Sequence, residues 1–383
     1  MTAKRKRRFG WFFVLSALLV GAGGYWLAAR YLNFADTPMA GIDAGDSVVV
    51  ERGDSFVTVL GKLYQAGVPG GQEMEWQVLS RQLGVAGKLQ VGEYALEPGL
   101  TPRQLLQRMS SGKVVSHRFT IVEGWNIREL RAALARATPL EQETTQMDDA
   151  ALMAAVGAPG QHPEGRFLPE TYAYTRGDSD LDVLKRAHAD LAKALDAAWA
   201  KRIPELPLKN KDEALILASI VEKETGIASE RPQIAGVFVR RLNTGMLLQT
   251  DPTVIYGMGA NYRGNIRRTD LQTDTPYNTY TRAGLTPTPI AMPGVDALNA
   301  ATRPAPGDTL YFVAVGDGSG RHVFSRSLQE HNAAVRAYVQ RYRQNGGAAS
   351  PPPTSVPVPA VPPASGEAAT PADPTNGTTP PAQ

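Results

Sequence analysis

"DEALILASIVEKET", residues 212–225, is the most apolar helical stretch of the folded part of the chain, and it ends on two carboxylates, Glu222 and Glu224. Ionised carboxylates are among the last groups that a protein core accepts, so their place at the end of an apolar run needs a reason. The helical period sets the two side chains about 200° apart, so they cannot both face one cleft. Each continues an apolar stripe, and the period therefore leaves open which of them does.

The pair of glutamates has two interpretations. In the first, one glutamate pairs with Lys223, Arg231 or another base, and the other is solvated at the helix end. In the second, one glutamate projects into a cleft with apolar walls, where desolvation raises its pKa. It then stays protonated and can act as a general acid.

Polar and aromatic residues follow this helix in two loops. Gln249 and Asp251 lie after the next predicted helix, and Asn278 and Tyr280 belong to "TPYNTYTRAGL". Amides, hydroxyls and aromatic rings are the groups that bind sugars, through hydrogen bonds and stacking. Taken singly, each is equally typical of a turn, and Asp251-Pro252 in particular is a common turn starter.

The N-terminal segment has the features of a membrane anchor. Five of the chain's 40 basic residues lie in 4–8, and the 21 residues from Phe9 to Ala29 carry no charge. About 20 apolar residues cross a bilayer as a helix, whereas the apolar region of a signal peptide is shorter. The sequence therefore predicts a cytoplasmic basic segment at 1–8 and a transmembrane helix at 9–30, with the rest on the far side.

Composition excludes several classes of function. Outside residues 4–8 the chain has 35 basic and 37 acidic residues, which gives no case for a nucleic-acid partner. The absence of cysteine removes disulfides, thiol nucleophiles and thiolate zinc sites. The five histidines are far apart, and no GxSxG, Walker or dinucleotide motif occurs, so we expect no metal and no cofactor.

The pattern along the chain predicts an α+β protein with several parts. Residues 31–45 read as a linker, and residues 46–115 as a small α+β module whose strand, helix, helix, strand order resembles a LysM-like module. Residues 116–345 are predicted to form a larger mixed α+β catalytic domain. Residues 346–383 are dominated by Pro, Ala and Thr, which predicts a disordered tail.

Several ordered strings resemble the MltG-type (YceG-like) endolytic murein transglycosylases. They are "LILASIVEKETG", "SERPQIAGVFVRRLNTGMLLQTDPTVIYG", "YNTY" with "GLTPTPI", "MPG", and "HVF" with a following "HN". The resemblance covers roughly Val48 to Tyr342 and includes "GEY" with "PG" in the small module and "GRFLPETY" further on. One departure is a loop in which the family often reads "GLPP" and this chain has "GLTP", residues 284–287.

The resemblance implies an anchored enzyme of the inner membrane with a periplasmic catalytic domain. The family cleaves glycan strands internally, between N-acetylmuramic acid and N-acetylglucosamine, and leaves a 1,6-anhydro muramyl end. Its catalytic residue is the second glutamate of "EKE", here Glu224. The expected partners are peptidoglycan strands, the bilayer and peptidoglycan synthases, and the expected role is termination of strand elongation.

A single carboxylate is enough for this reaction, unlike ordinary glycosidases, which use two. Gln249, Asp251, Asn278 and Tyr280 are then expected to position the sugar or to stabilise developing charge. Two alternative hypotheses about the function remain. One is a hydrolase in which Asp251 or Glu170 activates water, and the other is a non-catalytic cell-wall scaffold whose LysM-like module binds glycan.

Overall fold

The computed structural model describes residues 3–43, 45–68 and 70–344. The chain divides into two compact units. The first consists of Met1–Val122 and Ile127–Asp190, and the second of Glu123–Asn126 and Leu191–Gln383. The predicted mixture of helices and small sheets is confirmed. Of the larger domain predicted at 116–345, residues 116–122 and 127–190 group with the N-terminal part instead. The tail predicted at 346–383 lies outside the described residues.

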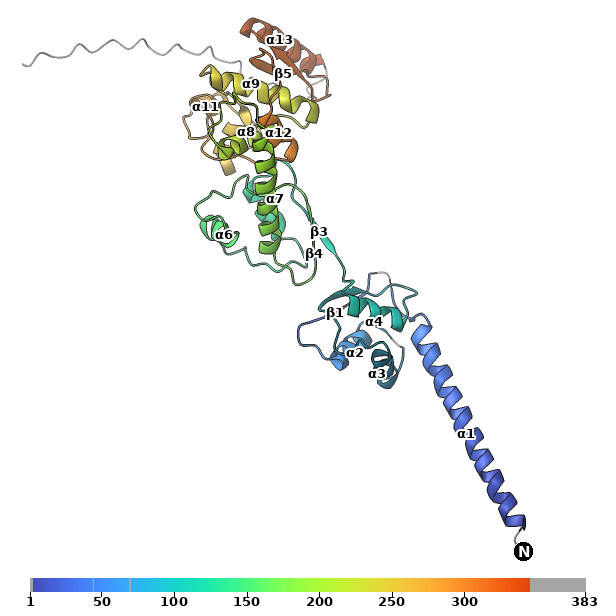
Figure 1. Ribbon diagram of the computed structural model, residues 1–383. Helices are drawn as coiled ribbons and strands as arrows, with labels where there is room; N and C mark the ends of the chain where they lie inside the picture. Colours follow the sequence, from blue (N-terminus) through green and yellow to red (C-terminus); the bar gives the residue numbers. More distant parts are fainter. Residues whose placement is uncertain (1–2, 44, 69, 345–383) are drawn as a thin grey trace, which may run out of the picture. The chain divides into compact units, whose positions relative to one another are not determined.

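The small module of the first unit has the predicted strand, helix, helix, strand order. Its two strands pair antiparallel, with Val48 opposite Tyr94. The following helix is capped by Thr101, whose hydroxyl accepts from the Gln104 N–H at 3.3 Å, and it carries Pro102 in its first turn. The elements are β1 (Ser47–Val50), α2 (Phe56–Gln65), α3 (Glu73–Gln82), β2 (Gly92–Ala95) and α4 (Pro102–Ser111) (Figure 1).

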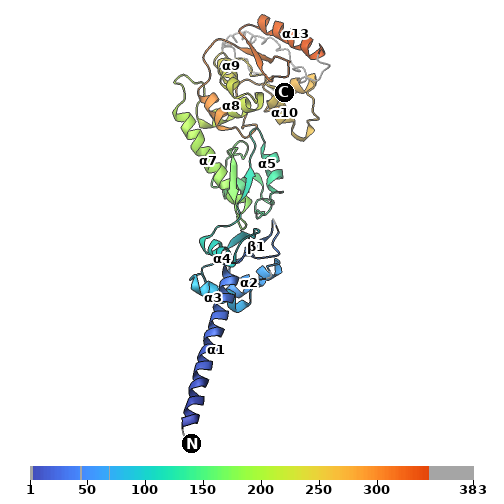
Figure 2. The same cartoon turned by 90° about the vertical axis from the view of Figure 1, so that its right-hand side faces the viewer.

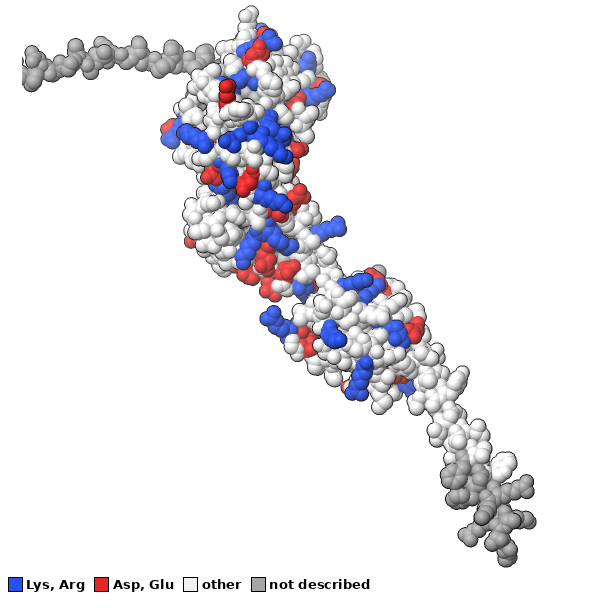
Figure 3. Space-filling view, in the orientation of Figure 1, with Lys and Arg blue, Asp and Glu red and all other residues white. Residues whose placement is uncertain are grey.

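The first described element is a long helix, α1 (Ala3–Asp36). Its described side chains from Val14 to Ala29 carry no charge, and Figure 3 shows this part of the helix in white. Large apolar side chains such as Leu19 and Trp26 are exposed there. Among the residues that the structure describes, none of the helices combines the length and the hydropathy that crossing a membrane requires.

Residues 31–45, predicted to be a linker, belong largely to the folded module. Helix α1 continues to Asp36, and Ala35, Met39 and Ile42 are buried in the module's hydrophobic core. The local pattern of this segment does not show that its apolar residues are covered by elements that lie far from them in the sequence.

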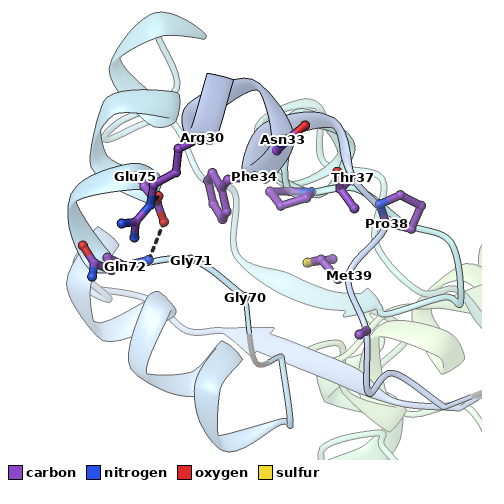
Figure 4. Close-up of a pocket in the computed structure, with 12 residues that line it drawn as sticks. Arg30, Asn33, Phe34, Thr37, Pro38, Met39, Gly70, Gly71, Gln72 and Glu75 are labelled. Carbon is purple, nitrogen blue, oxygen red and sulfur yellow. Dashed lines mark hydrogen bonds and ion pairs between the residues drawn. The ribbon is translucent and has the colours of Figure 1, made fainter. Parts of the chain in front are cut away.

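The end of α1 packs against α3 beside an open cavity of about 620 Å³ (Figure 4). The Phe34 ring meets Trp76 edge to face, with 5.1 Å between the ring centroids. Arg30 Nε donates to Glu75 Oε1 at 2.7 Å, and Glu75 also accepts from the Gln72 N–H. These contacts hold the last turns of α1 on the module.

The remainder of the first unit surrounds a second antiparallel strand pair. β3 (His117–Thr120) pairs with β4 (Thr171–Tyr174), and Phe119 lies opposite Tyr172. Two short helices, α5 (Ile127–Leu134) and α6 (Asp149–Ala155), lie between these strands in the sequence. The long helix α7 (Asp180–Ala200) begins in the first unit and ends in the second.

The second unit is built around the helix predicted from "DEALILASIVEKET". α8 (Lys211–Glu224) starts at Asn210, whose side chain accepts from the Glu213 N–H, and every residue from Ala214 to Glu222 is buried. It is covered by α9 (Arg231–Asn243), α10 (Asp251–Met258) and α12 (Val295–Thr302) (Figure 2). Because α8 is apolar on nearly all sides, it packs against several helices at once.

The rest of the second unit includes a β-hairpin. β5 (Tyr311–Ala314) and β6 (His322–Ser325) pair antiparallel, and the last helix, α13 (Leu328–Gln344), packs on both strands (Figure 1). The short elements of this unit are η1 (Ala228–Glu230), η2 (Gly259–Asn261) and α11 (Arg268–Gln272).

Candidate active site

Glu224 is the last residue of α8, where the chain leaves the helix. The next residue, Thr225, is extended, with φ −148° and ψ 135°. The Glu224 carboxyl group accepts a hydrogen bond from the hydroxyl group of Thr250, which immediately precedes α10. The end of the most buried helix and the loop after α9 therefore meet at this carboxyl group.

The surroundings of Glu224 favour its protonated form near neutral pH. The pKa of Glu224 is raised from 4.5 to about 7, chiefly by burial and also by the negative charge of Asp251. The Thr250 hydrogen bond and the positive charge of Arg241 act in the opposite direction and lower the pKa. Such a carboxyl group can both donate and accept a proton close to pH 7, as a general acid–base catalyst must.

Asp251 and Tyr280 form a second polar pair beside Glu224. The Tyr280 hydroxyl group donates to Asp251 Oδ1 at 2.6 Å. Asp251 is also the first residue of α10, where the helix dipole stabilises a negative charge. The structure thus brings two carboxyl groups from different elements close together, each with its own hydroxyl donor.

Gln249 and Asn278 differ in how they relate to this pair. Gln249 stands directly before Thr250 in a left-handed backbone conformation, with φ 49°. Asn278 is buried, and its amide donates to the carbonyls of residues 270, 271 and 273. Its Oδ1 accepts from the Tyr280 N–H at 2.9 Å. The Asn278 side chain therefore holds the loop that presents Tyr280.

Glu222 points away from Glu224 into a buried ion pair. Its Oε1 accepts from Arg231 Nη2 at 2.8 Å, and its Oε2 accepts from the Gly294 N–H at 3.0 Å. Arg231 also binds Glu123 at 2.9 Å. Of the bases weighed from the sequence, Arg231 is the partner of Glu222, while Lys223 donates to the Gly124 carbonyl.

Two residues of the site are assigned no role by the sequence pattern. Thr250 stands between two of the candidate residues but carries no distinguishing pattern, and its contact with Glu224 spans 26 positions. Arg241 is buried at the end of α9, where its Nη1 donates to the Leu248 carbonyl at 2.6 Å. A buried arginine cannot be recognised from helical spacing, because most arginines are exposed. The described residues include no group of three or more His, Asp or Glu side chains arranged to hold a metal ion.

Comparison with known proteins gives consistent matches. The sequence profile of the YceG-like family matches residues 48–337. A Bacillus subtilis protein named endolytic murein transglycosylase is 32% identical over 287 residues, which is 70% of this chain and 78% of that protein. Proteins of the same name from two Streptococcus pneumoniae strains are 30% identical over 184 residues, 46% of this chain and 32% of theirs. A YceG-like protein from Listeria monocytogenes, whose crystal structure is known, is 28% identical in sequence to this chain. The two structures match with a TM-score of 0.48 over 75% of this chain and 98% of that one.

Proposed function

Since this chain belongs to the YceG-like family, we propose that it is an endolytic transglycosylase that cleaves the glycan strands of peptidoglycan. The observation that carries the proposal is the environment of Glu224. This carboxyl group ends a buried helix, accepts the Thr250 hydrogen bond, and has a pKa raised to about 7. The names of the relatives supply the substrate class.

The proposed reaction needs one carboxyl group in two protonation states. Protonated Glu224 donates its proton to the glycosidic oxygen between N-acetylmuramic acid and N-acetylglucosamine, and the bond to muramyl C1 breaks. The resulting carboxylate then takes the proton from the muramyl C6 hydroxyl group, whose oxygen closes on C1. The product is a 1,6-anhydro muramyl end, and Glu224 is protonated again. Attack from within the same sugar is favoured by its high effective concentration.

Neighbouring residues would position the sugar. We assign contacts with the substrate to Gln249, Asp251 and Tyr280, because the Asp251–Tyr280 pair lies beside Glu224 and Gln249 adjoins Thr250. The negative charge of Asp251 would also stabilise positive charge that develops at C1. We assign Asn278 an indirect role, since its amide is bound to backbone groups of its own loop.

Digestion of isolated peptidoglycan, with the products read by mass spectrometry, tests the proposal. The wild-type protein should release ends that are lighter by one water than reducing ends, and Glu224→Gln should release none. Glu205→Gln, a change at an exposed position of the same unit, serves as the control. Reducing ends from the wild type would establish a hydrolase. A wild type that binds glycan without cleaving it would establish a scaffold.

We further propose that residues 9–30 anchor the protein in the inner membrane as a single span. The N-terminus would then be cytoplasmic and both folded units periplasmic, where nascent strands and their synthases are found. The support is the sequence, in which residues 4–8 are basic and 9–29 are uncharged. Extraction of membranes with alkali should leave the full chain in the pellet and release a variant that lacks residues 1–30; release of both would contradict the anchor.

A further inference from the structure

The corner that joins α9 to α10 is held in an unusual conformation. Gln249 is the one non-glycine residue with positive φ among those that the structure describes. Its N–H donates to the Thr279 carbonyl at 3.1 Å. On the other side of the corner, Arg241 donates to the carbonyls of Leu247 and Leu248. A strained residue persists where several contacts fix it, and such residues cluster at functional sites.

Three buried threonines fix the same corner. Thr250, Thr253 and Thr279 are 2%, 0% and 3% exposed. The Thr250 N–H donates to Thr279 Oγ1 at 3.1 Å, and the Thr253 hydroxyl group donates to the Thr250 carbonyl at 2.7 Å. The hydroxyl groups of Thr253 and Thr279 are 2.9 Å apart. Each hydroxyl group has a single proton, and that of Thr253 is already used, so Thr279 must donate to Thr253.

The Thr250 hydroxyl group, by contrast, donates its proton outside this cluster. Thr250 is the residue that caps α10, yet its side chain makes no capping hydrogen bond. Threonine at this position ordinarily accepts from a backbone N–H of the first turn. Here the hydroxyl group donates to Glu224 Oε1 instead.

We propose that Thr250 is a positioning residue, which by donating to Oε1 leaves Oε2 as the oxygen that carries the catalytic proton. A carboxylic acid holds its proton on one oxygen, and the oxygen that accepts a hydrogen bond acts as the carbonyl oxygen. The Gln249 corner and the three threonines then serve to aim this hydroxyl group. The inference rests on the proposed role of Glu224 as the acid.

The same hydrogen bond connects Thr250 to the pH dependence of the reaction. The charged or titratable groups that act on the Glu224 carboxyl group are Asp251 from α10 and Arg241 from α9. Tyr280, from the following loop, binds Asp251. Thr250 lowers the pKa of Glu224 because its hydrogen bond favours the charged form. Removing the hydroxyl group should raise that pKa, while Asp251 and Arg241 remain in place.

The test is the profile of kcat/KM against pH for the full chain acting on peptidoglycan. Thr250→Val should move the alkaline limb upward by about one pH unit, the size expected for one hydrogen bond to a carboxylate. Its kcat should fall roughly tenfold, because the proton is less well placed. Thr250→Ser keeps the hydroxyl group and should restore both values. If the valine protein does not fold, Thr250→Ala carries the same expectation.

Two controls separate the possible causes. Thr302→Val removes another buried hydroxyl group of the same unit, one that donates to the Leu298 carbonyl, and should leave the alkaline limb unchanged. Thr250→Val with lower activity but an unmoved limb would show that Thr250 only supports the loop, and would overturn the inference. Glu224→Gln is measured in the same series, and activity in this variant would show that the proposed acid is wrong. If Glu224→Gln is inactive but the alkaline limb of Thr250→Val does not move, only the role of Thr250 is refuted.

Discussion

Replacing Glu224 by glutamine should make the second unit more stable at alkaline pH while abolishing its activity. In the wild type, burial raises the pKa of Glu224 from 4.5 to about 7, so the folded protein holds this proton more tightly than the unfolded chain does. A carboxyl group of this kind contributes stability at low pH that is lost as the pH rises through the interval from 4.5 to about 7. Glutamine has no charge to desolvate, and its carbonyl oxygen can still accept the Thr250 hydrogen bond.

The size of the effect follows from the pKa. A difference of about 2.5 pH units corresponds to about 3 kcal/mol at 1.36 kcal/mol per unit. Partial contact of Glu224 with solvent reduces this free energy to about 2 kcal/mol. In a unit of this size, about 2 kcal/mol corresponds to a rise of roughly 6 °C in Tm.

The assay is thermal unfolding of wild type and Glu224→Gln near pH 5 and near pH 8. The glutamine variant should match the wild type more closely at the lower pH and exceed it by the stated amount at the higher one. Glu205→Gln, at an exposed position, should show no such dependence. An equal Tm difference at both pH values would refute the claim that Glu224 is held in a desolvated, proton-retaining site.

Three further outcomes follow from the same structure. The kcat/KM of the wild type should fall as the pH rises through about 7, because Glu224 must be protonated to act; steady-state rates from pH 5 to 9 measure this. Glu222→Ala should destabilise the second unit by about 3–5 kcal/mol, because it leaves Arg231 buried without its main partner; denaturant unfolding measures this. Gly112→Ala should destabilise the small module by about 1 kcal/mol, because φ is 69° at this helix end, and thermal unfolding of the full chain should show the change in the first unit only.

Local structure was the part of the fold that the sequence predicted best. The helix at 212–225 and the strand, helix, helix, strand order of the small module both depend on residues that lie close together in the sequence. The prediction of a linker at 31–45 is wrong because the burial of this segment depends on residues that are distant in the sequence. Burial of Ala35 and Met39 depends on α3 and α4, which come from elsewhere in the chain. The grouping of residues 127–190 with the N-terminal part likewise depends on the pairing of β3 with β4.

In the candidate site, too, local spacing predicted some features, whereas others depend on contacts between distant residues. Helical spacing indicated that Glu222 and Glu224 face opposite ways, and the structure agrees, since one binds Arg231 and the other Thr250. Spacing could not say which of the two had which partner. The partners are determined by contacts with α9 and with the loop before α10, and local helical spacing cannot predict contacts with other elements.

The opposing effects on the pKa of Glu224 suit a carboxyl group that must first donate a proton and then accept one. A carboxyl group exposed to water would be ionised at neutral pH and could not donate to the glycosidic oxygen. One that is buried without other contacts would hold its proton too tightly to give it up. Here burial and Asp251 favour the acid, while Thr250 and Arg241 favour the carboxylate that remains after donation. Asp251, which favours the acid, is the first residue of α10, whereas Thr250 and Arg241, which favour the carboxylate, lie in the loop before α10 and in α9. Each can therefore be altered separately, and the pH at which the protein works should follow the group that is removed: upward without Thr250 and downward without Asp251.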